Sequence, residues 1–375
     1  MQRNLLGIIV FGLLISILST LNSAPVVPSC FAATSQNNEY SFWKNVGKIA
    51  GDTALQNLNI KKCQKGDCIA LSNAGYAQID ARFTQAALDG LTNVLKVSRG
   101  DFSLMEIHSN SATPLWFAVY HKTSGICIYL EVNYDAVTGI YKSNQISTSH
   151  LFSTATKTVI TAEKLFENPT ESAAVFDANI FNGNEFRIVT AVNGILAGAP
   201  SDVLRSIELH DHYCPGVTSG VFLARYLEEE FPLASGGSYF VQSVQPWCKE
   251  DALLAILNTT PGKKGYDVLY PTDEDMAGWK DEVKDAANII YRKDPDTGTW
   301  DGIVVGVSLG ETDCPTYDHT LLDKLCSDLY HLENIDKPEN YITLLQTFSL
   351  PSDADPKDYA RPGVDPMQLL GFTSD

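Results

Sequence analysis

One plan of secondary structure occurs twice in this chain of 375 residues, and it limits the fold more than any other feature. Residues 40–133 and 204–308 each begin with a helical segment that carries small residues, and each continues with a short strand and a second helix. Both stretches end in a hairpin with a glycine-containing turn, at 120–132 and at 291–307. The pattern predicts an α+β fold of two related helix–strand–helix–hairpin units packed together. We interpret it as a degenerate internal duplication; the alternative is a loose likeness between two unrelated α+β segments.

The remaining stretches separate and flank these units. The segment between them combines Thr- and Ser-rich loops with apolar runs, and residues 186–192 have the composition of a strand. After residue 335 the chain is rich in Pro and Asp, so we expect a tail that wraps the surface. We therefore divide the chain into a targeting segment, a first unit, a connecting region, a second unit and a tail, at residues 1–32, 40–133, 134–202, 203–335 and 336–375.

The charge balance argues against two classes of partner. Lys and Arg number 27 against 45 Asp and Glu, which gives a formal net charge of −18. Such a surface repels phosphate backbones and anionic lipid headgroups, so we expect neither nucleic-acid binding nor adsorption to a membrane surface. With 44% hydrophobic and 19% charged residues, the chain can form two ordinary cores. A homo-oligomer is compatible with this composition.

The N-terminus has the pattern of an export signal. Arg3 precedes an uncharged and almost wholly apolar run, residues 5–21, and small residues follow it. Cleavage after Ala24 or Ala32 would release the rest of the chain. Because the run is at the lower limit for crossing a bilayer, an uncleaved anchor is the alternative. Both interpretations place the folded part outside the cytoplasm and limit membrane contact to this segment.

The second unit contains the pattern His-x-His-x-Cys-Pro-Gly, which is the most specific chemical signal in the chain. If residues 209–214 are extended, their alternation places His210, His212 and Cys214 on one face. Pro215 favours a helix start directly after Cys214, and a helix N-terminus lowers the pKa of a thiol. Two imidazoles and a thiolate are ligands that Zn²⁺ or another borderline transition metal prefers. The sequence therefore predicts a metal site here.

A second patch lies between a strand and a helix and can complete this site. Cys248 is a candidate fourth ligand, and Asp251 is the candidate catalytic residue, which would position a ligand histidine or a water molecule. The alternative is a Cys214–Cys248 disulfide, although a disulfide leaves the two histidines unexplained. Farther along, residues 259–265 form a Gly/Lys turn suited to an anion, for which an ordinary loop is the alternative.

These residues together resemble the FmdE family of formylmethanofuran dehydrogenase proteins over about residues 204–308. The resemblance implies an α+β core, a bound metal that is commonly zinc, and an association with the C1 metabolism of methanogenic archaea. It implies little about a reaction. The family usually has Gly between the two histidines, where this chain has Asp211. The positions that match the family pattern are His210, His212, Cys214, Pro215, Gly216, Gly220, Cys248, Asp251, Ala252, Thr260, Gly262 and Lys263.

The first unit lacks these ligands, so we expect a metal-free half that helps to close a cleft. Asn73, Tyr76 and residues 106–109 are its candidate lining, although His108 taken alone is more typical of an ordinary strand histidine. The remaining cysteines predict local disulfides, Cys63 with Cys68 and Cys314 with Cys326.

The sequence leaves three functions open. The first is an exported zinc protein with an enzymatic or redox-linked role, in which a metal with an open coordination position acts as a Lewis acid. The second is a non-catalytic extracytoplasmic receptor for a metal, a metallocofactor or a small anionic ligand such as a C1 carrier. The third is a disulfide-stabilised domain whose motif has lost its role, which the charge at Asp211 favours.

Overall fold

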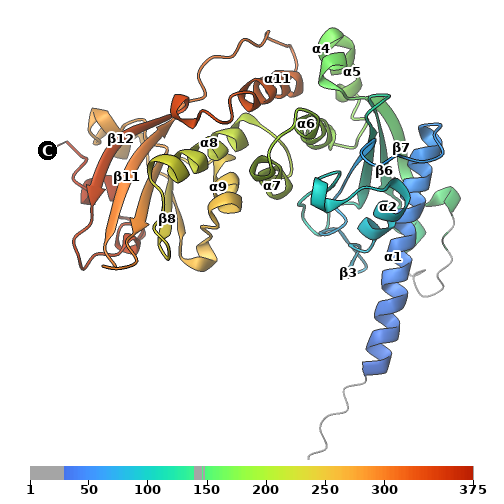
Figure 1. Ribbon diagram of the computed structural model, residues 1–375, viewed down its shortest axis with the longest axis horizontal. Coiled ribbons are helices and arrows are strands. Elements are labelled where there is room, and N and C mark those ends of the chain that lie inside the picture. The colour runs from blue at the N-terminus through green and yellow to red at the C-terminus, as the bar shows by residue number, and fades with distance from the viewer. Residues whose placement is uncertain (1–28, 139–145, 147, 375) are drawn as a thin grey trace, which may run out of the picture.

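Two β-sheets lie at opposite ends of the molecule, with a layer of helices between them (Figure 1). The computed structural model describes residues 29–138, 146 and 148–374. Residues 1–28, which include most of the predicted export segment, lie outside this range. Among the described residues, none of the helices combines the length and apolar character that crossing a bilayer requires.

The first sheet has five strands in the order β4-β1-β5-β6-β7. β1 pairs with β4 in parallel, and the other neighbours in this sheet are antiparallel. A two-stranded ribbon of β2 (Gln78–Ile79) and β3 (Arg82–Phe83) stands apart from it. The strands of the sheet are β1 (Cys68–Ser72), β4 (Leu104–Glu106), β5 (Trp116–His121), β6 (Ile126–Val132) and β7 (Phe152–Val159).

The second sheet repeats this arrangement strand for strand. Read from β9, its order is β9-β8-β10-β11-β12, and β8 pairs with β9 in parallel while the other neighbours are antiparallel. Its strands are β8 (Ser238–Val244), β9 (Tyr266–Leu269), β10 (Asn288–Lys293), β11 (Trp300–Val307) and β12 (Ile342–Ser349). The chain is thus a mixed α and β protein, and both predicted hairpins, β5–β6 and β10–β11, are present.

Each sheet also has a matching pair of helices in close contact. In the first unit α1 (Ser29–Asn57) precedes β1 and α2 (Ala87–Leu95) follows it; in the second, α8 (Pro215–Glu230) and α9 (Lys249–Leu257) flank β8 in the same way. Glycine permits the close approach in both pairs. A Cβ atom at Gly47 would lie 1.9 Å from the Ala87 carbonyl oxygen, and one at Gly220 would lie 2.2 Å from that of Lys249. Gly47 and Gly220 therefore hold equivalent places in the two helix pairs.

The layer between the sheets joins both units into one core. Alternate residues of β1, Ile69 and Leu71, face this layer, whereas Ala70 faces α1 and α2. On the second sheet Val241 and Ile290 face the same layer. Its helices are α4 (Ala162–Glu167), α5 (Pro169–Asp177), α6 (Glu185–Leu196), α7 (Ser201–His210) and α11 (Thr320–Leu332), together with α8 and α9; α3 (Tyr134–Val137), α10 (Asp273–Ala277) and α12 (Pro366–Leu369) are short peripheral turns.

One prediction about these segments is wrong, and another is incomplete. Residues 186–192 lie within helix α6 and not in a strand, because this apolar run is buried on nearly every side, where β-branched residues suit a helix as well as a strand. The tail after residue 335 does more than wrap the surface. It supplies β12, which pairs with β11 along its length, and it buries Tyr359 and Met367 against the outer face of the second sheet.

The disulfide predictions are confirmed. Cys63 is bonded to Cys68, and Cys314 is bonded to Cys326. Within the described part of the chain Cys127, Cys214 and Cys248 are free thiols, so the alternative of a Cys214–Cys248 disulfide is not what the structure contains.

Candidate metal centre

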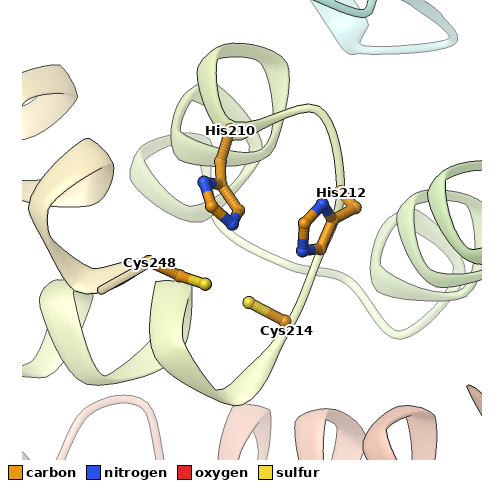
Figure 2. Close-up of side chains that lie close together, drawn as sticks. All are labelled: His210, His212, Cys214 and Cys248. Carbon is orange, nitrogen blue, oxygen red and sulfur yellow. The ribbon is translucent and has the colours of Figure 1, made fainter. Parts of the chain in front are cut away.

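Three helix ends converge on one point between the two sheets. α7 ends at His210, α8 begins after Cys214, and Cys248 stands at the N-terminal end of α9. His212 lies in the short connection between α7 and α8, and Figure 2 shows its ring and that of His210 directed toward the two sulfur atoms. This connection is fixed to the central layer, because the Tyr213 N–H donates to Thr190 Oγ1 on α6 at 3.1 Å.

The predicted extended conformation of residues 209–214 is only partly correct. Cys214 is extended, but His210 is the last residue of a helix, and Asp211 has a φ of +76° in the left-handed region. The turn at Asp211 reverses the chain direction. It brings His210 and His212 together with a ring-centroid separation of 4.3 Å, a contact that alternation along a strand does not require.

The four predicted metal ligands form one cluster. One donor atom each from His210, His212, Cys214 and Cys248 lies within 4.8 Å of the other three. His210 Nε2 is buried and has no hydrogen-bond partner among the described residues. A buried polar atom without a partner is costly, and a metal ion would satisfy it. Two imidazoles and two free thiols are the donor set of tetrahedral zinc sites, so these residues fit a metal ion.

Two carboxylates hold the imidazole rings from outside the cluster. His210 Nδ1 lies 2.7 Å from Asp251 Oδ2, and His212 Nδ1 lies 2.6 Å from Asp211 Oδ1. Each contact fixes the ring orientation and leaves the other ring nitrogen for the cluster, as carboxylates commonly do for metal-bound histidines. Asp251, for which the sequence suggested a ligand-positioning or water-positioning role, contacts a ligand histidine. Its assignment as a catalytic group stays a prediction.

Hydrogen bonding within the cluster favours a thiolate at Cys248 and a neutral thiol at Cys214. Contacts with Cys214 first, and then with the two histidines, lower the pKa of Cys248 to about 2. Burial lowers the pKa of His210, but its interactions with the Asp251 carboxylate and with the nearby Cys248 sulfur outweigh it and raise this pKa to about 9. The helix N-terminus acts on Cys214 in the predicted direction, because the Val217 N–H lowers the pKa of the thiol, but two larger effects outweigh it. Its pKa is raised, because its S–H donates to the Cys248 sulfur and because the thiol is buried.

Asp211 is the position at which this chain departs from the family pattern, and the structure shows why Asp is tolerated there. A φ of +76° favours glycine, which the family usually has here, but Asp is among the residues that tolerate the left-handed region. The carboxylate also contacts Arg187 on α6, with Oδ2 2.9 Å from Nε. Burial raises the pKa of Asp211, but His212 and Arg187 outweigh it and lower this pKa overall. The added charge is thus compensated within the site.

We expect the Asp211→Gly variant to fold normally and to bind metal about 10- to 100-fold more weakly. Glycine adopts the required backbone conformation, but it removes the acceptor that orients the His212 ring. The measurement is competition for metal against a chromophoric chelator, with Asp211→Asn as the control that keeps an acceptor oxygen. Equal affinities for the parent protein and Asp211→Gly would contradict this role for the carboxylate.

The predicted anion turn does not join the cluster. Thr260, Gly262 and Lys263 follow the C-terminal end of α9, and Pro261–Lys263 forms a 3₁₀ turn. Cys248 lies at the opposite end of this helix, which at the usual rise is about 13 Å long. The Lys263 ammonium donates to Asn258 Oδ1. Anion binding by this turn stays a prediction, separate from the metal centre.

Two cavities border the centre. One of about 210 Å³ has Asp211 and Arg187 on one side and residues 107–110 of the first unit on the other. His108 and Ser109 therefore lie where the sequence expected the first unit to line a cleft, whereas Asn73 and Tyr76 do not line this cavity. The other cavity, of about 460 Å³, includes His212 in its wall.

Sequence reasoning missed several residues around the centre. Arg187 and Phe186 on α6 contact Asp211 and the His212 ring, and His319 and Lys324 line the larger cavity. No motif links these positions to the histidines. The helical periodicity of residues 185–196 was the available signal, since it would have placed Phe186 and Arg187 at the start of a buried helix.

Comparison with known proteins agrees with this geometry. Residues 209–313 match the family described as FmdE, Molybdenum formylmethanofuran dehydrogenase operon. No curated protein matches the chain. The matched range includes all four residues of the cluster and Asp251. The chain therefore carries an FmdE-like domain at residues 209–313.

Proposed function

We propose that this protein binds one zinc ion with His210, His212, Cys214 and Cys248. The observation that carries the proposal is the convergence of four donor atoms within 4.8 Å of one another, with the buried His210 Nε2 left without another partner. Zinc is favoured over other metals because it is borderline-soft and accepts mixed sulfur and nitrogen ligands in a tetrahedron. Four ligands from three helix ends would tie those helices together.

We further propose that the protein works outside the cytoplasm and is linked to C1 metabolism. The disulfides Cys63–Cys68 and Cys314–Cys326 support an oxidising compartment, as does the apolar run at residues 5–21. The link to C1 metabolism rests on the name of the family that matches residues 209–313. The shared strand order of the two sheets supports a duplication in which only the second unit carries the ligands.

The test is the metal content of the full-length protein, measured by elemental mass spectrometry. We expect about one equivalent of zinc in the parent protein and none in the Cys214→Ser, His212→Ala double variant. The Cys127→Ala variant is the matched control, because Cys127 is a buried free thiol outside the cluster. A parent protein that holds no metal after incubation with zinc would overturn the proposal.

A metal receptor is the second candidate, and partial exposure of the ligands favours it. The His212 side chain is 23% exposed, and Cys248 is half-buried. A receptor must exchange its metal with the surroundings, whereas a structural or catalytic site retains it. Exchange of bound zinc for an isotopically enriched zinc pool separates the two. Exchange within minutes supports a receptor, and retention for hours supports a permanent site.

A further inference from the structure

Apart from His212, the larger cavity is lined by segments that lie outside the matched family domain. Phe176 comes from α5, Glu185 and Phe186 come from α6, and α11 contributes its first turn. Its volume of about 460 Å³ is in the range of small-molecule sites.

Positive charge is concentrated on the α11 side of this cavity. Lys324 forms no ion pair among the described residues, and its ammonium group lies 5.4 Å from the centre of the Phe186 ring. α11 begins at Thr320 without a side-chain cap, so its first backbone N–H groups lack that acceptor. His319 Nδ1 is buried without a hydrogen-bond partner. In a protein of net charge −18, a lysine without an ion-pair partner beside an uncapped helix N-terminus suits an anionic ligand.

The negative groups at the cavity are already engaged. Glu185 Oε1 accepts the Phe181 N–H at 2.6 Å, and this side chain is buried in the helix start. Asp177 Oδ1 lies 3.4 Å from His319 Nε2. Neither carboxylate forms an ion pair with Lys324, so the lysine is available to a ligand.

Aromatic rings form the walls between this charge and the metal centre. The Phe186 ring meets the His212 ring edge to face at 4.9 Å, and the Phe176 ring lies 6.2 Å from that of His319. Phe186 therefore touches a metal ligand on one side and Lys324 on the other. A flat apolar group can pack on these rings while its charged end reaches the lysine.

We propose that this cavity binds a small carboxylate with a flat, unsaturated body. The carboxylate contacts Lys324 and the N-terminus of α11, and the body packs on Phe176 and Phe186 with its far end at His212. The placement beside a bound metal rests on the proposed zinc site; the recognition of the carboxylate by Lys324 does not. The ligand class deepens the proposed function by giving the centre an anionic small-molecule partner.

The first test uses benzoate as the probe and benzamide as its neutral counterpart, with the full-length zinc-loaded protein and ligand-observed NMR titration. We expect benzoate to bind at least about tenfold more tightly than benzamide, because only the carboxylate makes charge-assisted hydrogen bonds. Lys324→Met should weaken benzoate binding at least about tenfold, and Lys324→Arg should restore most of it. Lys122→Met, which removes an exposed lysine elsewhere, should change nothing.

Equal binding of benzoate and benzamide, or an unchanged affinity in Lys324→Met, would overturn the recognition of a carboxylate. Because Lys324 is exposed, its variants are expected to melt like the parent protein, and a melting curve verifies this.

The second test separates this inference from the zinc proposal. With Co²⁺ in place of Zn²⁺, a ligand beside His212 should show strongly enhanced proton relaxation, and absence of this enhancement would overturn the placement. If the protein binds no metal at all, the zinc proposal fails, while the benzoate titration of the metal-free protein still decides the role of Lys324.

Discussion

Removing the metal with a chelator is expected to lower the melting temperature of the zinc-loaded protein by about 8 °C or more. The cluster joins the end of α7 to the starts of α8 and α9, so a bound metal would hold together helices that contact both units. A ligand present at a thousand times its dissociation constant stabilises the folded state by about 4 kcal/mol. For a domain of this size, 1 kcal/mol corresponds to about 2 °C.

The measurement is a thermal melt with and without excess chelator, followed by circular dichroism. The Cys248→Ser variant should melt near the temperature of the chelated parent and should not respond to the chelator. Cys127→Ala can melt at a lower temperature for packing reasons, yet its response to the chelator should equal that of the parent. A parent protein whose melting temperature is the same in both conditions would show that the cluster does not stabilise the fold.

The residues of the candidate metal centre could be predicted from sequence because their chemistry is local. His210, His212 and Cys214 lie within five positions, and a thiol beside two imidazoles has few ordinary structural explanations. Their geometry could not be predicted in the same way. Two backbone conformations can bring these three side chains together. One is an extended strand, and the other is a helix end followed by a residue in the left-handed region. Only the φ of Asp211 distinguishes them, and the family glycine was the indication of that conformation.

The elements that were predicted wrongly depend on distant contacts. Residues 186–192 are apolar and rich in branched side chains, and they form a helix because the central layer surrounds them on nearly every side. The strand at Ile342–Ser349 sits in a Pro- and Asp-rich tail, and it exists because the free edge of β11 accepts it. Local composition indicates neither fact, and only the periodicity of residues 185–196 favoured the helix. The hairpins were predicted correctly because a turn and its two strands are adjacent in sequence.

The two units share an architecture but differ in the residues at corresponding positions. Strand order, pairing directions and the glycine-mediated helix contact are the same in both units. The position that holds Cys248 in the second unit corresponds to the loop after β1 in the first, where Gly75 leaves room for the Glu106 side chain. Glu106 there pairs with Arg99, and Arg99 also contacts Glu208 on α7. α7 thus contributes Glu208 to an ion-pair cluster of the first unit and His210 to the candidate metal centre of the second.

The Asp328→Asn variant is expected to be more stable than the parent protein, and its advantage should grow as the pH rises. Asp328 on α11 is fully buried, and both of its carboxylate oxygens lack hydrogen-bond partners among the described residues. Burial raises the pKa of Asp328 well above its usual range; the charge of Lys324 opposes this and that of Cys248 adds to it. A neutral amide of nearly the same shape avoids the cost of burying a charge.

The direction with pH follows from comparing the folded and unfolded states. In the unfolded chain an Asp loses its proton near pH 3.9, whereas the folded state retains it to a higher pH. Between these two values the folded state binds more protons than the unfolded state, so stability falls as the pH rises. Each unit of difference in pKa corresponds to about 1.4 kcal/mol. Asn does not titrate and avoids this loss.

The measurement is the melting temperature of both proteins at pH 5 and pH 8, each loaded with zinc. The advantage of Asp328→Asn should be larger at pH 8 by at least about 2 °C, which corresponds to about one unit of pKa. The exposed Asp313→Asn substitution removes the same charge and should give no such difference. An Asp328→Asn variant that is less stable than the parent at pH 8 would contradict this prediction. It would mean that the carboxylate has a hydrogen-bond or ion-pair partner, because a buried charge stabilises the folded state only when such a partner compensates the loss of hydration.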